Sequence, residues 1–276
     1  MVKISIVLAT YNWPAALDVI LINLLPQLQK YPQVELIIAD DGSGPETKAI
    51  VDKYKNLLPK LQHIWHEDAG FRKSMILNQA VAASRGEYLL FLDGDCVPFP
   101  DYIAEHLKLM ENKYFVAGNR VLLSQIYTKY ALQNPAVIST MFEWNSLTWL
   151  IAKLNHKVNK VLPGLRLGAG KWRYSRSSNW KYPKGGNFAL SRRDFLTVNG
   201  FDESFSGWGH EDADLFIRLL HNGIKIKDGR FAIPVLHLWH KESDRGQEQS
   251  NYQRLMERLL DKSCIKSTVG IDKYLP

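Results

Sequence analysis

The sequence contains few cysteines, no long apolar run and neither of the common glycine-rich phosphate motifs. Its two cysteines, Cys96 and Cys264, cannot build a disulfide framework or a structural zinc site, so we expect a reducing, cytoplasmic location. No stretch approaches the ~18 consecutive apolar residues that a membrane span needs. The start, MVKISIVLATYN, lacks the apolar region and cleavage site of a signal peptide. The absence of G-x-G-x-x-G and of G-x-x-x-x-G-K-[ST] disfavours a dinucleotide site and a P-loop.

What the chain does contain is an ordinary globular composition with an uneven charge. Its 276 residues are 46% hydrophobic and 23% charged, which suits one large α/β domain or two small ones with a buried core. The net charge is +7, but residues 120–184 hold eleven Lys and Arg and a single acid, Glu143. That segment therefore carries about +10, and the remainder of the chain about −3.

Two interpretations of residues 120–184 remain open. The segment also holds nine aromatic residues. It is either a solvated helical insert whose tryptophans pack inward, or a surface for anionic lipid headgroups or an anionic acceptor. Nucleic acid is disfavoured as a partner because no nucleic-acid-binding motif occurs in the sequence.

Apolar runs alternate with amphipathic stretches over roughly the first hundred residues. Because these runs are continuously apolar, strands are expected at 3–10, 34–39, 61–66 and 87–93. Helices are expected at 15–30, with a bend or break at Pro26, and at 46–58, 73–84, 211–222 and 247–262. Alternation of this kind predicts a parallel, doubly wound α/β sheet.

Polar residues follow three of the expected strands. Thr10-Tyr11-Asn12, Asp40-Asp41 and Asp93-Gly94-Asp95 all lie at carboxyl ends of strands, where open α/β sheets bind ligands. Asp93 and Asp95 are two residues apart in a turn, so both carboxylates can face one ligand, and Gly94 permits a close approach. Such oxygen ligands suit hard divalent cations, which keep open positions for phosphate oxygens. The pattern predicts a metal site that neutralises a departing pyrophosphate.

Several of these motifs resemble a known family. VLATYNWP, ADDGSGPET and GFRKSMILNQAVAASRGEYLLFLDGDC resemble the inverting sugar-nucleotide glycosyltransferases of family 2. KGGNFALSRRDFLTVNGFDESFSGWGHEDADLFIRL is similar to the C-terminal half shared by β-1,4-galactosyltransferases and chondroitin-polymerase-type enzymes. The resemblance covers roughly residues 3–100 and 183–240, and it implies a GT-A fold with a Rossmann-like, mostly parallel central sheet flanked by helices.

The same resemblance implies a domain organisation. Residues 1–245 would form the glycosyltransferase domain, and residues 246–276 a C-terminal helical tail. Within that domain we expect three parts: a nucleotide-binding half at 1–100, a helical basic insert at 105–180, and an acceptor and catalytic half at 181–245.

A donor site for a UDP-sugar follows from the resemblance as well. Tyr11 and Asp41 would hold the uracil ring, by stacking and by a hydrogen bond to its imide N–H. Asp93 would bind the ribose or the metal, and Gly186 would let the backbone approach the donor sugar. The remaining nucleotide-binding and donor-binding residues that it implies are Thr10, Asn12, Arg72, Gly94 and Asn187.

The resemblance assigns metal, base and acceptor roles to the remaining motifs. Asp95 would coordinate Mn²⁺ or Mg²⁺ together with Asp93, and His237, at the end of an apolar strand, would complete the shell, with His240 as the alternative. Asp212 would be the general base that deprotonates the acceptor hydroxyl. The acceptor would meet Trp208, Gly209 and Glu211, and Glu211 would also help catalysis by positioning the sugar.

These features predict a metal-dependent, inverting glycosyltransferase. It would move a hexose or N-acetylhexosamine from a UDP-sugar to a hydroxyl of a glycan such as bacterial lipopolysaccharide or capsule, in the cytoplasm or peripherally on the inner face of the cytoplasmic membrane. A retaining GT-A glycosyltransferase is one alternative. A sugar nucleotidyltransferase is another, although residues 11–14 are not the glycine-rich phosphate loop that it needs. A non-catalytic carbohydrate-binding module would leave the acidic pairs unexplained.

Overall fold

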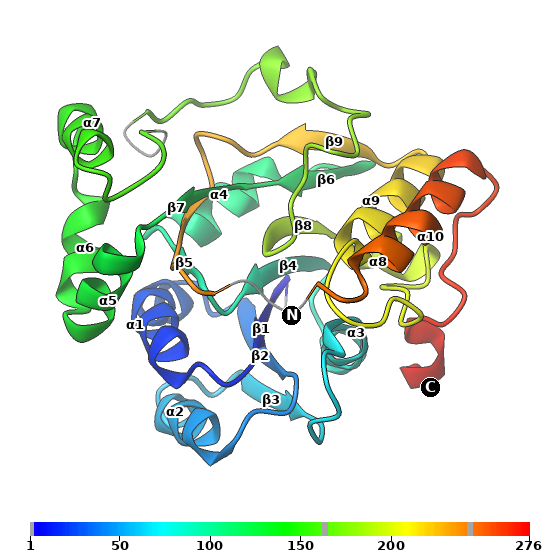
Figure 1. Cartoon of the computed structure of the whole chain (residues 1–276), viewed down its shortest axis with the longest axis horizontal. Coiled ribbons are helices and arrows are strands. Elements are labelled where there is room, and N and C mark those ends of the chain that lie inside the picture. The colour runs from blue at the N-terminus through cyan, green and yellow to red at the C-terminus, as the bar shows by residue number, and fades with distance from the viewer. Residues whose placement is uncertain (1–2, 162–164, 242–244) are drawn as a thin grey trace.

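The central element of the fold is one mixed sheet built from both halves of the chain (Figure 1). The computed structural model describes residues 3–161, 165–241 and 245–276. The sheet has the strand order β3-β2-β1-β4-β8-β6-β9. Its strands are β1 (Ile4–Thr10), β2 (Val34–Asp40), β3 (Leu61–Trp65), β4 (Tyr88–Asp93), β6 (Tyr114–Ala117), β8 (Asn187–Ser191) and β9 (Lys225–Asp228). The first four strands are mutually parallel, and β8 runs antiparallel to β4 and β6, so the predicted mostly parallel sheet is confirmed.

A small second sheet brings distant parts of the chain together. Its order is β5-β10-β7, with β5 at Cys96–Pro98, β7 at Asn119–Leu122 and β10 at Pro234–His237. The antiparallel pairing of β10 with β5 sets His237 opposite Cys96. Because Asp95 directly precedes Cys96, this register delivers His237 to the acidic turn after β4.

Helices cover both faces of the large sheet. Ile6 and Leu8 pack into one core cluster and Val7 into the other, since side chains alternate along a strand. The first cluster includes residues of α1 (Pro14–Lys30), α2 (Pro45–Lys55) and α4 (Tyr102–Leu109). The second includes residues of α3 (Lys73–Ala83), α8 (Arg192–Thr197) and α9 (Glu211–His221). The helix α10 (Glu248–Leu260) contacts α9.

The sequence located these elements well, and two expectations need correction. Pro26 does not break α1, which runs as one helix through it. Residues 105–180 are not purely helical, because β6 and β7 lie within them and join the two sheets. After α4, the described residues of that region hold the helices α5 (Gln125–Gln133), α6 (Ala136–Phe142), α7 (Ser146–Leu154) and the short η2 (Lys171–Tyr174). Figure 1 shows α5, α6 and α7 as a column at one edge of the molecule.

The chain ends in a short 3₁₀ turn, η3 (Ile271–Tyr274), beside α3. Among the residues described above, no helix has both the length and the apolar character needed to cross a membrane.

Candidate active site

A cavity of about 850 Å³ opens at the carboxyl ends of β1, β2 and β4. Parallel strands end at the same edge of a sheet, and this is where such folds bind ligands. The predicted site residues that line it are Thr10, Tyr11, Asn12, Asp41, Asp93, Gly94, Asp95, Trp208, Glu211, His237 and His240. The structure therefore brings both halves of the predicted site together in one place.

The turn after β4 fits tightly against β1. A Cβ atom on Gly94 would lie 2.6 Å from the backbone oxygen of Ala9, so a larger residue would push the turn away from β1. Glycine at this position thus fixes where Asp93 and Asp95 enter the cavity.

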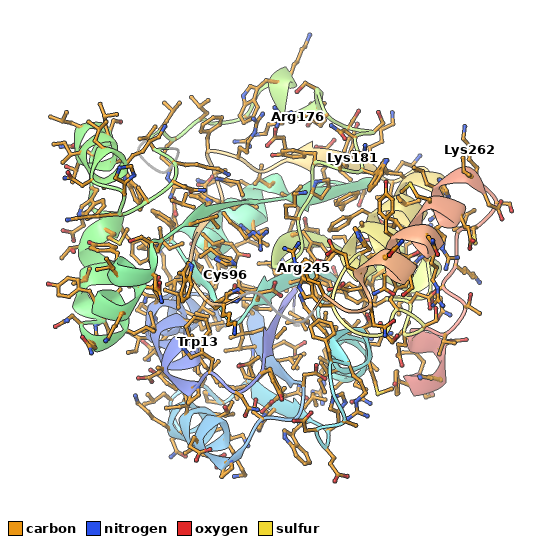
Figure 2. All side chains as sticks on the ribbon, in the orientation of Figure 1. Trp13, Cys96, Arg176, Lys181, Arg245 and Lys262 are labelled. Atoms are coloured by element: carbon orange, nitrogen blue, oxygen red, sulfur yellow. The ribbon has the colours of Figure 1, made fainter. Side chains whose placement is uncertain are left out.

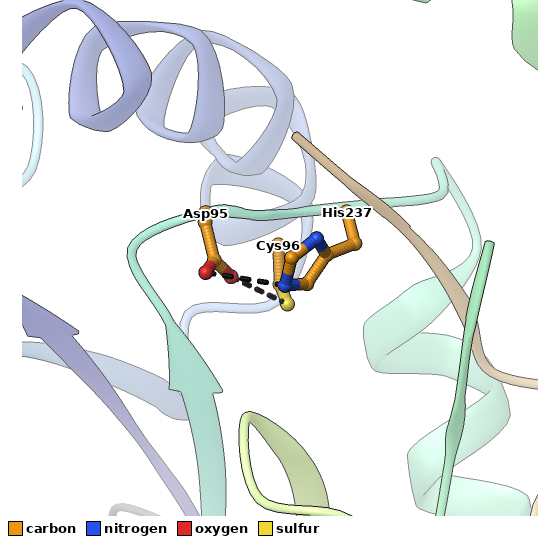
Figure 3. A group of neighbouring side chains, drawn as sticks. All are labelled: Asp95, Cys96 and His237. Atoms are coloured by element: carbon orange, nitrogen blue, oxygen red, sulfur yellow. Dashed lines mark hydrogen bonds and ion pairs between the residues drawn. The ribbon is translucent and has the colours of Figure 1, made fainter. Parts of the chain in front are cut away.

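The imidazole rings of two histidines approach the carboxylate of Asp95. Its Oδ2 lies 3.3 Å from Nε2 of His237 and 3.0 Å from Nε2 of His240. Figure 3 shows Asp95, in the turn before β5, and His237, at the end of β10, pointing toward each other, with the Cys96 side chain beside them. Burial opposes ionisation of Asp95, but the hydrogen bonds of the two histidines outweigh it and hold the pKa of Asp95 below its usual range.

This group of side chains suits a divalent transition-metal cation. One carboxylate and two imidazole nitrogens converge on the cavity wall. The carboxylate is a donor that Mn²⁺ prefers, and imidazole nitrogens are ligands of first-row transition metals in general. Cys96 is close enough to be a ligand, but its thiol donates a hydrogen bond to Oδ1 of Asp95 at 3.0 Å. Burial raises the pKa of Cys96 well above its ordinary value, so the thiol is protonated in this arrangement.

Asp93 has a cationic partner that the sequence did not identify. Lys73, in the first turn of α3, lines the cavity, and its Nζ lies 2.8 Å from Oδ1 of Asp93. Burial opposes the charge of Lys73, but the carboxylates of Asp93, Asp212 and Glu211 outweigh it and raise the pKa of Lys73 above its usual range. A permanent positive charge thus lies beside the acidic residues of the cavity.

Asp212 has the altered acidity expected of a general base. Burial is the largest cause, and with the nearby charges of Glu211 and Asp93 it raises the pKa of Asp212 to about 7, against the opposing effect of Lys73. Of the two acids that begin α9, Glu211 lines the described cavity and Asp212 does not. The carboxylate of Asp212 packs against Gly185, where a Cβ would lie 1.5 Å from its Oδ2.

A strained loop delivers these two acids. Gly209 and His210 have φ angles of 113° and 71°, so the chain enters α9 through left-handed conformations. The backbone N–H of Gly209 donates to Oε2 of Glu211 at 3.2 Å, which holds that carboxylate at the helix start. Trp208 lines the cavity, and the guanidinium of Arg245 lies 5.0 Å from its ring centre.

The opposite end of the cavity has the predicted uracil-site residues. Tyr11 is 52% exposed, and its hydroxyl donates to Asp68 at 2.9 Å. Asp41 accepts the backbone N–H of Arg72 at 2.9 Å, and its other oxygen lies 2.7 Å from Nε2 of His66. Burial raises the pKa of Asp41 despite both contacts. A carboxylate has about four acceptor positions, so Asp41 retains capacity for one more donor.

Besides Asp212, four predicted residues lie outside the described cavity lining: Arg72, Gly186, Asn187 and Gly209. The Arg72 side chain donates to the backbone oxygen of Glu67, away from the acidic turn. Asn187 accepts from the Tyr102 hydroxyl at 3.0 Å and donates to the backbone oxygen of Ile233 at 2.9 Å, so it joins elements of the core. Gly186 has φ +79°, and a Cβ there would lie 2.3 Å from Oδ2 of Asp93. Asn187 and Gly186 therefore support the site from outside its lining, the first through hydrogen bonds and the second by packing against Asp93.

Sequence reasoning missed several residues that line the cavity. They include Trp13, Lys73, Arg120, Leu122, Leu123 and Arg245, of which Figure 2 labels Trp13 and Arg245. Lys73 follows Arg72 directly in the sequence. Because neighbouring residues of a helix point about 100° apart, the residue at which α3 begins determines which of the two side chains faces the cavity. Arg120 gave no signal beyond its place in the basic segment.

Sequence comparison finds two family matches. Residues 5–182 match the family described as "Glycosyl transferase family 2", and residues 165–241 match "N-terminal domain of galactosyltransferase". Together these two matches span both motif groups that meet in the cavity.

Curated relatives agree with those matches. The chain is 28% identical to the hyaluronan synthase of Pasteurella multocida, over 100% of this chain and 28% of that protein. It is 26% identical to a chondroitin synthase of Escherichia coli, over 80% of this chain and 32% of the relative. A segment of 42 residues is 52% identical to β-1,4-galactosyltransferase 1 of Mus musculus. The chain thus spans about a third or less of the two synthases.

Solved structures show the same fold at low identity. The S. aureus TarS fragment 1–349 in complex with UDP has a TM-score of 0.62 and 13% identity, over 99% of this chain and 68% of that one. The mannosyltransferase PcManGT of Pyrobaculum calidifontis, in complex with GDP-Man and Mn2+, has a TM-score of 0.60 and 16% identity, over 97% and 65% of the two chains.

Proposed function

The chain belongs to glycosyl transferase family 2 and has the GT-A fold, and we propose that it transfers a hexose or N-acetylhexosamine from a UDP-sugar to a glycan hydroxyl with inversion. The observation that carries this proposal is the convergence of two groups on one cavity. Asp95 with its two histidines lies on one side. Glu211, at the start of α9, lies on another side with Lys73 and Asp93, and the neighbouring Asp212 packs against Gly185 just outside the described lining.

We assign the metal site to Asp95 and His237, with His240 as a further or alternative ligand. Asp93 is the less available ligand because Lys73 already neutralises it at 2.8 Å. When bound, Mn²⁺ or Mg²⁺ would supply positive charge that stabilises the diphosphate leaving group. Lys73 supplies a second, fixed positive charge in the same cavity.

Asp212 is the proposed general base. Its carboxylate takes the proton of the acceptor hydroxyl, and the oxygen forms a bond to the anomeric carbon from the face opposite the nucleotide. The bond between that carbon and the phosphate oxygen breaks, and its electron pair leaves with UDP. A pKa of about 7 suits this role, because half of the residue is ionised at neutral pH and its ionised form is basic enough to accept the proton.

Binding residues position the two substrates. Tyr11 and Asp41 hold the uracil in this proposal, with the half-exposed ring available for stacking and the carboxylate available for the imide N–H. Trp208 offers a flat face to the acceptor sugar, and Glu211 orients it. Holding both partners in line contributes to the rate because the reaction then needs no further orientation.

The proposed acceptor is a bacterial surface glycan, such as lipopolysaccharide or capsule. Two of the relatives are named as synthases of hyaluronan and chondroitin, which supports a polysaccharide acceptor. The basic segment at 120–184 supports an anionic acceptor or work at the inner face of the cytoplasmic membrane.

A donor screen tests the reaction class without knowledge of the acceptor. The chain is incubated with Mn²⁺ and a panel of UDP-sugars, and slow hydrolysis is followed as UDP release. We expect one or two UDP-sugars to be hydrolysed and release to stop with a chelator. UDP release at the same background rate with every donor would reject the proposal. Once an acceptor is found, NMR must show a β-linked product from an α-linked donor, and an α-linked product would reject inversion.

Asp212→Asn tests the base. Loss of a general base typically costs 10²–10⁴-fold, so we expect kcat of transfer to fall by about that factor while UDP affinity stays unchanged. Its matched control, Asp272→Asn, alters an exposed aspartate in η3 and should have no effect. If Glu211→Gln removes activity and Asp212→Asn does not, the base assignment is wrong.

The stability of the same variant provides a check on its folding. The pKa of Asp212 is raised from its ordinary 3.8 to about 7 in the folded protein, so the fold loses stability as the pH rises from about 4 to about 7. The neutral amide should therefore raise Tm most at pH 8, less at pH 5, and hardly at all near pH 4. A lower Tm at pH 8 would show that the activity loss reflects misfolding.

A further inference from the structure

The helix α7 is apolar on two opposite sides. Trp149 and Ala152 are buried at 1% and 3% exposure, as expected of a face that packs on the core. Four further apolar side chains are 63%, 45%, 48% and 69% exposed: Leu147, Leu150, Ile151 and Leu154. Their spacing is i, i+3, i+4 and i+7, which places them on one face of the helix. An amphipathic helix of a globular protein normally carries polar residues there.

Packing fixes which face of α7 points outward. The ring of Trp149 lies 5.1 Å from that of Trp144 and 6.3 Å from that of Phe99, both within the core cluster or against it. The side chain of Asn145 caps the helix by accepting the backbone N–H of Thr148 at 2.9 Å. Figure 1 shows α7 at the outer end of the α5–α7 column, away from the central sheet. The exposed apolar face is therefore a consequence of how the helix is anchored.

The surroundings of this face are basic. Lys153 and Lys157 are exposed within α7 and just after it, and Nζ of Lys157 lies 5.2 Å from the ring centre of Tyr127. Between residues 120 and 184 the sequence has eleven Lys and Arg against the single acid Glu143. Apolar side chains bordered by lysines are the pattern of helices that lie in the plane of an anionic lipid surface.

We propose that α7 docks this protein on an anionic membrane, with its four exposed apolar side chains below the headgroups and the neighbouring lysines on the lipid phosphates. A second copy of the chain fits less well, because pairing two such faces would bring like charges together. This proposal deepens the proposed function by naming the bilayer as the anionic partner. The proposal rests on the proposed function, because docking on a membrane would give the enzyme access to a lipid-linked acceptor.

The cavity lies close enough to this column for docking to matter. Leu122 and Trp239 line the cavity and are each 42% exposed. The backbone N–H of Trp239 donates to Oγ1 of Thr128 in α5 at 2.9 Å, so one rim of the cavity is attached to the same column. A membrane under α7 would thus hold that rim near lipid-anchored substrates.

Vesicle co-sedimentation tests the proposal. The wild-type chain is mixed with vesicles of phosphatidylcholine alone or with phosphatidylglycerol added. We expect the wild type to bind the mixed vesicles. The Leu150→Ser/Leu154→Ser variant should lose about tenfold or more in vesicle affinity. In Lys153→Gln/Lys157→Gln, each lysine neutralised should lower that affinity about fivefold. High salt should weaken binding of the wild type. The matched control Leu57→Ser/Leu260→Ser changes two exposed leucines elsewhere, 48% and 83% exposed, and should bind normally.

Several results would overturn the proposal. These are no binding of the wild type to mixed vesicles, equal binding by the α7 and control variants, or a wild-type dimer in light scattering that the α7 variant converts to monomer. Hydrolysis of UDP-sugar without vesicles serves as the fold check, because none of the substituted residues lines the cavity described above. If no UDP-sugar is hydrolysed by any form while the vesicle results hold, the proposed function fails and the docking surface stands.

Discussion

At the scale of single residues, the positive charge of Lys73 affects the pKa of the proposed base, Asp212. Its ammonium group lowers the pKa of Asp212, which burial and neighbouring acids otherwise raise. It also pairs with Asp93 at 2.8 Å. The charge of one lysine is thus shared by two neighbouring carboxylates in a partly closed cavity, where unpaired charges are costly.

The pH dependence of catalysis follows from these contacts. Asp212 works as a base only when ionised, so kcat/KM should fall about tenfold per pH unit below about 7 in the wild type. Removing the charge in Lys73→Met should raise the pKa of Asp212 and move this acidic limb to higher pH by about one unit or more. Lys73→Arg, which keeps the charge, should leave the limb in place. An unchanged limb in Lys73→Met would contradict the coupling of these two residues.

Most of the predicted site residues lie together in the structure. The family resemblance predicts Asp95 and His237 as metal ligands, with His240 as the alternative, and the structure places Oδ2 of Asp95 within 3.3 Å of both imidazoles. The strand ends that carry Asp93, Asp95 and Asp41 could be located from the sequence because the strands themselves are recognisable. Lys73 was missed because a lysine at a helix start is usually a solvated charge, and only its contact with Asp93 shows otherwise.

At the scale of elements, the segment that leads into β8 determines the position of Asp212, the proposed base. Gly185 precedes that strand, and a Cβ on it would lie 1.5 Å from Oδ2 of Asp212. No positive φ is recorded for Gly185, so an alanine would be compatible with its backbone and would instead displace the carboxylate. The glycine is required by the close approach of the base.

Gly185→Ala should therefore reduce catalysis and leave folding intact. The carboxylate is the end of a side chain that can rotate away, so we expect kcat to fall at least about tenfold, since a misplacement of about 1 Å can cost about 100-fold. Gly168→Ala is the matched control, because its added Cβ meets no atom within 4 Å. Activity and Tm are measured for both. Wild-type turnover in Gly185→Ala would show that Asp212 need not occupy this position.

The C-terminal helix braces the helix that carries the acids. Arg258 of α10 donates to Asp214 at 2.9 Å and to Asp202 at 2.7 Å. Asp214 lies in the first turn of α9, is fully buried, and also accepts from Arg218 at 2.7 Å. Four charges thus form a buried network just beneath the start of α9, which explains why Asp214 has no access to the cavity.

Breaking this network should destabilise the protein. Arg258→Met removes one of the two arginines that pair with the buried Asp214 and the arginine that pairs with Asp202, and we expect a loss of about 3–5 kcal/mol in the free energy of unfolding by urea. Arg254→Met removes an exposed arginine of the same helix and should cost about 1 kcal/mol or less. If both variants lose equal stability, the buried network does not hold α10 to α9.

At the scale of the whole molecule, the two halves of the chain form one sheet and one site. The order β4-β8-β6-β9 places strands from the second half directly beside β4. The early strands were predictable because they are continuous apolar runs with regular spacing. The short strands β6 and β7 were not, because four residues between polar neighbours give no clear period in the sequence, and their pairing partners are distant in the chain.

Long-range strand pairing also determines where the proposed metal ligands lie. The register of β10 against β5 sets His237 opposite Cys96, and no local pattern of the sequence encodes that register. The resemblance to a family provided it instead, through the order of motifs along the chain.

Calorimetric titration of UDP is the most direct measurement of the central claim, that Asp95 and its histidines form the cation site of a nucleotide-sugar cavity. UDP is titrated into the wild type and into Asp95→Ala, with Mn²⁺ and with a chelator. We predict tight binding only in the wild type with Mn²⁺, and a large loss of affinity in the other three cases. Equal UDP affinity in all four titrations would contradict the account.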